Sequence, residues 1–147
     1  MRIPTILIAT VFLLAGTGLG ATSTGHAFFV VVHRKNKATA LDKKTLAQVF
    51  LKKRTQWSDD AVILPVDQTK SSAVRRHFSE EVLGRSVAAV RAYWNQLVFS
   101  GRGVPPPELG SDEAVLRYVG QHAGAIGYVS AAADIDAATD VEIVQVR

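Results

Sequence analysis

The sequence predicts an α/β domain in which a mostly parallel or mixed sheet is flanked by about four helices. Three observations support this class. β-prone apolar runs alternate with stretches of helical periodicity, the links between the runs are too long for hairpins, and 48% of the residues are hydrophobic while 20% are charged. The 147 residues suffice for one domain, and the absence of cysteine excludes disulfides, thiolate metal sites and a cysteine nucleophile.

The first 27 residues have the pattern of a cleaved export signal. Met1-Arg2 gives a positive start, residues 6–14 are apolar apart from one threonine, and Gly25-His26-Ala27 fits the small-x-small cleavage pattern, with Ala21 as the alternative cleavage position. The apolar run is far shorter than the roughly 20 residues that span a bilayer. We therefore expect a signal peptide over residues 1–27.

Export would leave residues 28–147 as a single domain, which holds one hydrophobic core but not two lobes. The chain has no cysteine at the expected cleavage position to carry a lipid anchor. We therefore expect a periplasmic protein without a stable membrane anchor.

In the first half of this domain, the sequence predicts a strand, a helix and a second strand. Residues 28–32 form a continuous β-prone apolar run, which is typical of a strand buried on both faces. Asp42 then precedes a short helix. The buried face of that helix would consist of Leu46, Val49 and Phe50. Residues 62–66 are a second strand, and Pro65 must lie at a sheet edge or near the strand end.

Three helices follow, and each begins at a serine: Ser71 or Ser72, Ser86, and Ser111. Their buried faces would be Val74, Phe78 and Val82; Val87, Val90, Trp94 and Leu97; and Val115, Val119 and His122. Residues 101–107 contain two glycines and three prolines, and we expect a loop there.

The C-terminal part reads as two strands around a weak helix. Residues 125–129 are a third strand, residues 131–138 are weakly helical, and residues 141–146 are a last strand, expected at an edge of the sheet.

Charge is distributed unevenly along the domain. Residues 28–77 carry 11 Lys/Arg and 4 Asp/Glu, whereas residues 78–147 carry 5 and 9. This pattern fits a basic face that attracts an anion or an acidic partner, and it also fits a solvated lysine-rich surface. Nucleic acid is not an expected partner, because no aromatic residues interleave with the basic ones.

No group of residues forms a catalytic pattern. The histidines, at positions 26, 33, 77 and 122, have no metal-ligand spacing, and no strand-turn-helix nucleophile motif is present. Asp59 and Asp60 are a pair of loop acids that either bind a cation or are solvated. We expect no enzyme, no metal and no cofactor.

The best candidate site lies where the second strand gives way to the second helix. The first N–H groups of a helix lack intrahelical partners, and this end of the dipole is positive. Hydroxyls, N–H groups and charge at such a start suit a phosphate or sulfate. The candidate anion-binding residues are Thr69, Lys70, Ser71, Ser72, Ala73 and Arg75, with the N–H groups of Ser72 and Ala73 pointing at the anion. The alternative is that Ser71 only caps the helix.

Several segments occur in an order and spacing that point to a known family. They are Val49-Phe50-Leu51-Lys52-Lys53 followed by Trp57; Ile63-Leu64-Pro65-Val66 before the serine-rich helix start; Tyr93-Trp94 followed by Phe99-Ser100-Gly101; and Gly124-Ala125-Ile126-Gly127-Tyr128-Val129. Together these segments resemble the phosphate-binding branch of the type II periplasmic solute-binding proteins.

The resemblance implies one α/β lobe related to the substrate-binding components of phosphate ABC transporters. Two departures stand out. The chain matches only the second of the family's two lobes, and the family pattern there is an Arg, three residues, then Ser-Gly-Thr. Here Asp67 stands in place of the Arg, and Ser71, Ser72 and Ala73 stand in place of Ser-Gly-Thr. An acid at position 67 would repel phosphate, or accept a hydrogen bond from a protonated phosphate oxygen.

Two functions therefore remain open at this stage. The first is weak binding of phosphate or a similar oxyanion by an open lobe, whose missing wall comes from a homodimer or a protein partner in the envelope. The alternative is a protein-interaction module of the cell envelope that keeps the lobe but binds no ligand.

Overall fold

The structure is a computed structural model, and it describes residues 27–147. The expected signal peptide lies outside the described residues, except for Ala27. The elements in chain order are β1 (Phe28–His33), β2 (Ala40–Leu41), α1 (Lys43–Phe50), β3 (Leu64–Pro65), β4 (Asp67–Gln68), α2 (Ala73–Phe78), the π-helix η1 (Ser79–Leu83), α3 (Val87–Phe99), β5 (Glu108–Leu109), α4 (Asp112–Gln121), β6 (Ala125–Ser130) and β7 (Val141–Val146).

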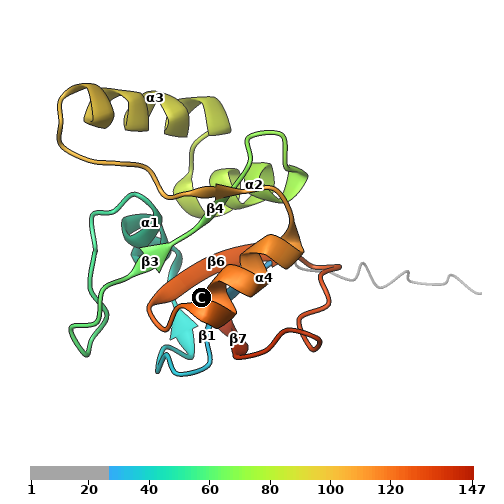
Figure 1. Ribbon diagram of the computed structural model, residues 1–147. Helices are drawn as coiled ribbons and strands as arrows, with labels where there is room; N and C mark the ends of the chain where they lie inside the picture. The colour runs from blue at the N-terminus through green and yellow to red at the C-terminus, as the bar shows by residue number, and fades with distance from the viewer. Residues whose placement is uncertain (1–26) are drawn as a thin grey trace, which may run out of the picture.

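The main sheet has five strands in the order β2-β7-β1-β6-β3 (Figure 1). β1 lies in the centre and runs antiparallel to both neighbours, with Val31 opposite Gly127 of β6 and Ile143 of β7. The short outer strands β2 and β3 pair in parallel with β7 and β6. The sheet is therefore mixed rather than mostly parallel, and a second two-stranded sheet, β4-β5, lies beside it.

The core forms two clusters because the residues of β1 alternate between the two faces of the sheet. Val30 and Val32 pack with the apolar residues of α1, α2 and η1. Val31 packs on the other face with the apolar residues of α4. In the first cluster the ring of Phe78 stacks on that of Tyr128, with 3.9 Å between the centroids. Both faces of the central strand are buried, as its continuous apolar run predicted.

The helix starts agree with the sequence signals. Asp42 caps α1, Ser86 caps α3 and Ser111 caps α4. At α2 the cap is Ser72, whose Oγ accepts from the N–H of Arg75, and not Ser71. Gly84 ends η1 with a φ of 61°, a left-handed conformation that glycine adopts without strain.

Three expectations are corrected. Residues 131–138 form a series of turns instead of a weak helix, because Asp134 accepts from the N–H of Ala137 and stabilises a turn. The strand expected at 62–66 shortens to β3, and the chain then turns into the second sheet. The edge beyond β7 is covered by β2, so β7 lies one place inside the sheet edge.

Among the described residues, no helix has the length and apolar content needed to cross a membrane.

Candidate functional site

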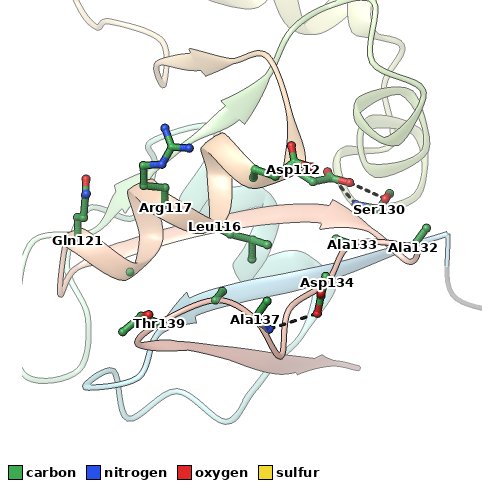
Figure 2. Close-up of a pocket in the computed structure, with 13 residues that line it drawn as sticks. Asp112, Leu116, Arg117, Gln121, Ser130, Ala132, Ala133, Asp134, Ala137 and Thr139 are labelled. Atoms are coloured by element: carbon green, nitrogen blue, oxygen red, sulfur yellow. Dashed lines mark hydrogen bonds between the residues drawn. The ribbon is translucent and has the colours of Figure 1, made fainter.

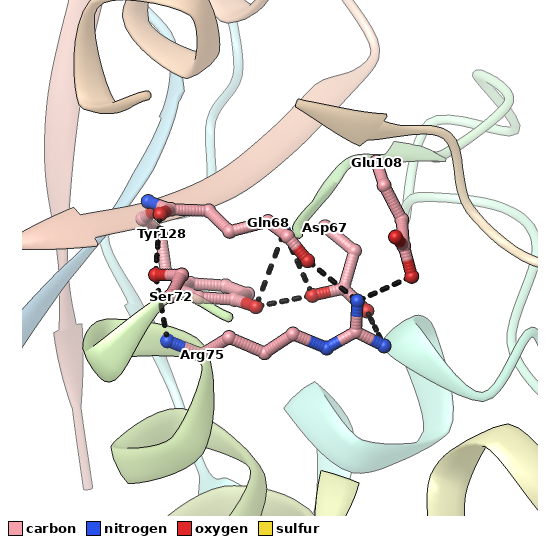
Figure 3. Close-up of polar contacts among 6 residues, drawn as sticks. All are labelled: Asp67, Gln68, Ser72, Arg75, Glu108 and Tyr128. Carbon is pink, nitrogen blue, oxygen red and sulfur yellow. Dashed lines mark hydrogen bonds and ion pairs between the residues drawn. The ribbon is translucent and has the colours of Figure 1, made fainter. Parts of the chain in front are cut away.

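Six polar residues meet beneath the start of α2, and we call them the polar cluster. They are Asp67, Gln68, Ser72, Arg75, Glu108 and Tyr128 (Figure 3). The two short strands β4 and β5 bring Asp67 opposite Glu108 and Gln68 opposite Leu109. α2 supplies the cap and the guanidinium, and β6 supplies the phenol.

The carboxylate of Asp67 is the centre of this cluster. The residue is only 8% exposed. Its oxygens accept hydrogen bonds from the N–H of Gln68 (2.9 Å) and from the hydroxyl of Tyr128, and Arg75 Nη2 lies 3.1 Å from Oδ2. Burial raises the pKa of Asp67 above its usual value, while the charge of Arg75 and the hydroxyl of Tyr128 oppose that rise. Burial also raises the pKa of Tyr128, so its hydroxyl stays protonated and donates.

Arg75 is turned inward in this conformation, and its guanidinium is paired with groups of the protein. The residue is 3% exposed. Besides its ion pair with Asp67, its Nη1 donates to the carbonyl of Gln68 and to a carboxylate oxygen of Glu108. A buried guanidinium needs such partners, since an unpaired buried charge is costly. Of the expected site residues, Arg75 therefore lies inside the protein and is already paired.

Ser72 and Gln68 connect the cluster to the start of α4. Ser72 Oγ donates to Gln68 Oε1 (2.8 Å). Gln68 Nε2 donates to Asp112 Oδ1 (2.8 Å) and to the carbonyl of Tyr128 (3.1 Å). The Ser130 N–H and hydroxyl also donate to Asp112. The first turns of α2 and α4 are thus held to the same strand, β6, by side-chain hydrogen bonds.

The remaining candidate residues lie on the outer side of the turn. Lys70, Ser71 and Ala73 are exposed, and Thr69 is half-buried. The N–H of Ser72, which we expected to point at the anion, instead donates to the carbonyl of Thr69 (2.9 Å).

The first two backbone donors of α2 are free. Within residues 27–147, no hydrogen bond uses the N–H of Ala73 or of Val74. The structure therefore separates the expected residues into two sets: Ser72 and Arg75 in the buried cluster, and Thr69, Lys70, Ser71 and Ala73 on the surface beside free N–H groups.

Sequence reasoning missed four members of the hydrogen-bond network, namely Gln68, Glu108, Asp112 and Tyr128. Three of them reach Asp67, Gln68 or Arg75 from segments far along the chain, such as Tyr128, 61 positions after Asp67. The only local signal was the pair Asp67-Gln68 directly after an apolar strand, where two polar side chains are buried.

A separate groove of about 930 Å³ lies between α4 and residues 130–139 (Figure 2). Figure 2 shows Leu116 pointing into it, with Asp112 and Ser130 joined at one end. At the other end the backbone of Gly120 approaches the Thr139 carbonyl so closely that a Cβ would collide with it. None of the expected anion-binding residues lines this groove.

Metal binding has no support in the part of the chain that the structure describes. No three His, Asp or Glu side chains there are placed to hold an ion. The His33 ring nitrogen Nδ1 accepts from the N–H of Lys35 (3.0 Å), and His122 Nδ1 lies 2.7 Å from the carbonyl of Tyr118. Both histidines have local structural partners.

Similar folds occur in phosphate-transport proteins. The chain is 20% identical to a phosphate ABC transporter substrate-binding protein from Clostridium perfringens, solved with bound phosphate (TM-score 0.59, covering 82% of this chain and 44% of that one). It is 21% identical to an ABC-type phosphate transport receptor from Vibrio cholerae (TM-score 0.60, 82% and 46%). It is 14% identical to PstS from Borrelia burgdorferi (TM-score 0.63, 82% and 47%).

These similarities concern the fold, and the chain spans less than half the length of each of these proteins. No curated protein matches the sequence significantly. The family model described as the PBP superfamily domain matches residues 24–145, nearly the whole chain. The mixed sheet, the helices on its two faces and this match lead to one conclusion: the chain belongs to the PBP superfamily domain family, as a single lobe.

Proposed function

We propose that the chain is an exported, periplasmic oxyanion-binding module related to the substrate-binding components of phosphate ABC transporters. It takes phosphate or a similar small oxyanion weakly, at the outer side of the turn before α2. Residues 1–27 direct its export, and residues 28–147 form the working lobe. The role is binding, without catalysis.

One observation carries this proposal: the free N–H groups of Ala73 and Val74 stand next to the exposed Ser71 and Lys70. Unpaired donors at a helix start with an adjacent cation suit a small anion. Ser71 would donate its hydroxyl, and Lys70 would supply charge. Ser72 and Arg75 would act from beneath, by fixing the turn through the polar cluster. A relative of this fold holds phosphate, which supports the choice of anion.

The binding is expected to be weak because the site has one wall. One helix terminus in water contributes on the order of 1 kcal/mol, whereas a millimolar Kd needs about 4 kcal/mol. Two backbone donors, a hydroxyl and a lysine together reach about that value. Tighter binding requires a second surface, from another copy of the chain or an envelope protein, to enclose the anion.

Phosphate titration followed by amide NMR shifts tests the proposal. We expect the amides of residues 69–75 to shift as phosphate rises to about 20 mM, where a millimolar site is nearly saturated, while chloride at the same ionic strength has little effect. The double variant Lys70→Ala/Ser71→Ala should abolish these shifts. Lys37→Ala/Thr39→Ala removes the same kinds of group at exposed positions elsewhere and should leave the shifts unchanged.

A second candidate function has its own observation. The Asp67 carboxylate already accepts from the N–H of Gln68, the Tyr128 hydroxyl and Arg75, a set of donors that also suits an oxyanion. In this alternative the lobe carries its own anion, binds none from solution, and acts in the cell envelope through protein contacts.

Asp67→Asn separates the two candidates. If the wild type shows no phosphate shifts and Asp67→Asn does, the anion site exists but Asp67 closes it, and the interaction module stands. If neither protein responds to phosphate, oxyanion binding is excluded for both forms. If the wild type responds through Lys70 and Ser71, the first candidate stands.

A further inference from the structure

Two segments of the chain carry cations and no carboxylates. Residues 43–58 and 82–107 contain eight Lys/Arg and neither Asp nor Glu. Seven of these cations are exposed and have no ion-pair partner within residues 27–147. One of the seven, Lys44, lies on α1, and the other six lie in the turn after α1, next to or on α3, or in the loop after α3. We call these six the basic surface: Lys52, Lys53, Arg54, Arg85, Arg91 and Arg102.

Tyr93 brings these two segments together in space. Its hydroxyl donates to the carbonyl of Leu51 (3.0 Å), directly before the cationic turn that follows α1. The guanidinium carbon of Arg85 lies 5.5 Å from the centroid of the same tyrosine ring. The turn after α1 and the middle of α3 are therefore neighbours. Figure 1 shows α3 on the outside of the molecule, away from the main sheet.

An apolar tip stands at the C-terminal end of α3. Phe99 is 96% exposed, and Val98 and Val104 are 53% and 69% exposed. Phe99 follows Tyr93 by six helical residues, about 9 Å along the axis. Arg102 lies beside the tip, with its Nε donating to Ser100 Oγ (3.1 Å). An almost fully exposed phenylalanine beside an unpaired arginine is typical of a surface that meets an apolar, negatively charged partner.

We infer that the basic surface and the apolar tip bind an anionic phospholipid membrane. The cations would contact lipid headgroups, and Phe99 would insert between the acyl chains near the interface. This inference goes beyond oxyanion binding at the turn before α2 and uses none of its residues.

Other occupants fit less well. A second copy that met this surface with its own would bring cations against cations. Residues 1–26 carry one arginine and no acid, so they lack the complementary charge. The groove beside α4 and a smaller one, lined by Arg34 and residues 135–143, do not include this surface. A projecting apolar tip fits a bilayer interface better than it fits a folded protein.

Vesicle co-sedimentation tests the inference with the full chain. We expect binding to vesicles of about 30% phosphatidylglycerol in phosphatidylcholine, at least about tenfold stronger than to pure phosphatidylcholine, and a steep loss when NaCl rises from about 0.1 M to about 0.5 M. All variants are produced identically, so any contribution of residues 1–26 is common to them. Equal binding to both vesicle types, or binding to neither, would overturn the inference.

Matched variants locate the surface. Lys52→Glu/Lys53→Glu should weaken binding at least about tenfold, whereas Lys35→Glu/Lys37→Glu makes the same change of net charge at exposed positions outside the basic surface and should weaken it far less. Phe99→Ala should weaken binding about fivefold or more, whereas Val62→Ala, which truncates another exposed apolar residue, should not.

Two outcomes would contradict the inference. Equal losses of vesicle binding in the two double charge variants would mean that binding depends only on net charge. Binding to polyglutamate but not to the vesicles would instead assign the surface to an acidic protein.

Discussion

At the scale of single residues, Asp67 is the position where the sequence departs from the phosphate-binding pattern that it resembles. The structure has a buried carboxylate there, with three donors around it. The cation that balances it comes from Arg75, one turn into α2. One positive and one negative group thus lie at this position, and both are buried.

The stability of the protein should depend on pH through Asp67. Burial raises the pKa of this carboxyl in the folded state. Its stabilising contribution is therefore present at pH values below the usual pKa of 3.8, and it is lost as the pH rises through the raised pKa. We expect the difference in unfolding free energy between the wild type and Asp67→Asn to grow in favour of the wild type as the pH falls from about 7 to about 4. Urea melts at several pH values measure it. A difference that shrinks on acidification would mean that the charge of Arg75, rather than burial, determines the pKa of Asp67.

Arg75 should be essential for stability while its neighbour is not. Arg75→Ala leaves Asp67 buried without its cation, and breaking a buried pair costs about 3–5 kcal/mol. Arg76→Ala removes the same charge from an exposed position that has no ion pair among residues 27–147, and it should change stability by less than about 0.5 kcal/mol. Chemical denaturation of both variants checks the contrast. Similar losses of unfolding free energy in the two variants would mean that the polar cluster is solvated.

The sequence predicted a polar turn before α2 but not the partners of the side chains there. A strand end, serine hydroxyls and nearby cations mark the turn before α2 from local pattern alone. The partners Tyr128 and Glu108 come from β6 and β5, and no local pattern shows which distant phenol or carboxylate a fold will bring to a turn. The buried or exposed state of Arg75 depends on those partners, so it could not be predicted either.

At the scale of elements, helix faces were predicted well because periodicity reports burial directly. Val90 and Trp94 on α3 are buried as expected. The prediction of a helix at 131–138 was wrong. The alanines there favour a helix, whereas Asp134 and Asp136 favour turns, and in the folded protein these residues pack beside α4 as turns.

Trp94 should hold α3 to the rest of the lobe. It is 5% exposed, and Trp94→Ala should cost about 3–5 kcal/mol of unfolding free energy. Phe99→Ala removes an aromatic ring from the same helix at a position 96% exposed, and it should change stability by less than about 0.5 kcal/mol. Thermal or urea melts of the two variants test the assignment of faces. A wild-type melt for Trp94→Ala would show that α3 packs through another face.

At the scale of the whole molecule, the α/β class followed from the sequence but the strand directions did not. The apolar run of β1 fits a central strand with either parallel or antiparallel neighbours, because burial on both faces is the same in both cases. The two-residue strands β2 and β3 are too short to leave a pattern of alternation. Direction and edge order come from chain crossings, which hydrophobic periodicity does not report.

The lobe should unfold as one cooperative unit although it is less than half the length of its structural relatives. The first core cluster packs α1, α2 and η1 on β1 and β6, and the second packs α4 on the opposite face of the same strands. α3 is held to the lobe by the buried Trp94 and by the Tyr93–Leu51 hydrogen bond.

The two tryptophans allow this cooperativity to be measured. Trp57 belongs to the first cluster, whereas Trp94 reports on α3. In Trp57→Phe and Trp94→Phe, the single remaining tryptophan should give the same urea midpoint as far-UV circular dichroism, as two-state unfolding requires. Trp94→Phe breaks no hydrogen bond, because the indole Nε1 has no partner among residues 27–147, so its cost comes from the smaller ring alone. An earlier midpoint for Trp94 than for Trp57 would instead mean that α3 opens as a separate unit while the sheet remains folded.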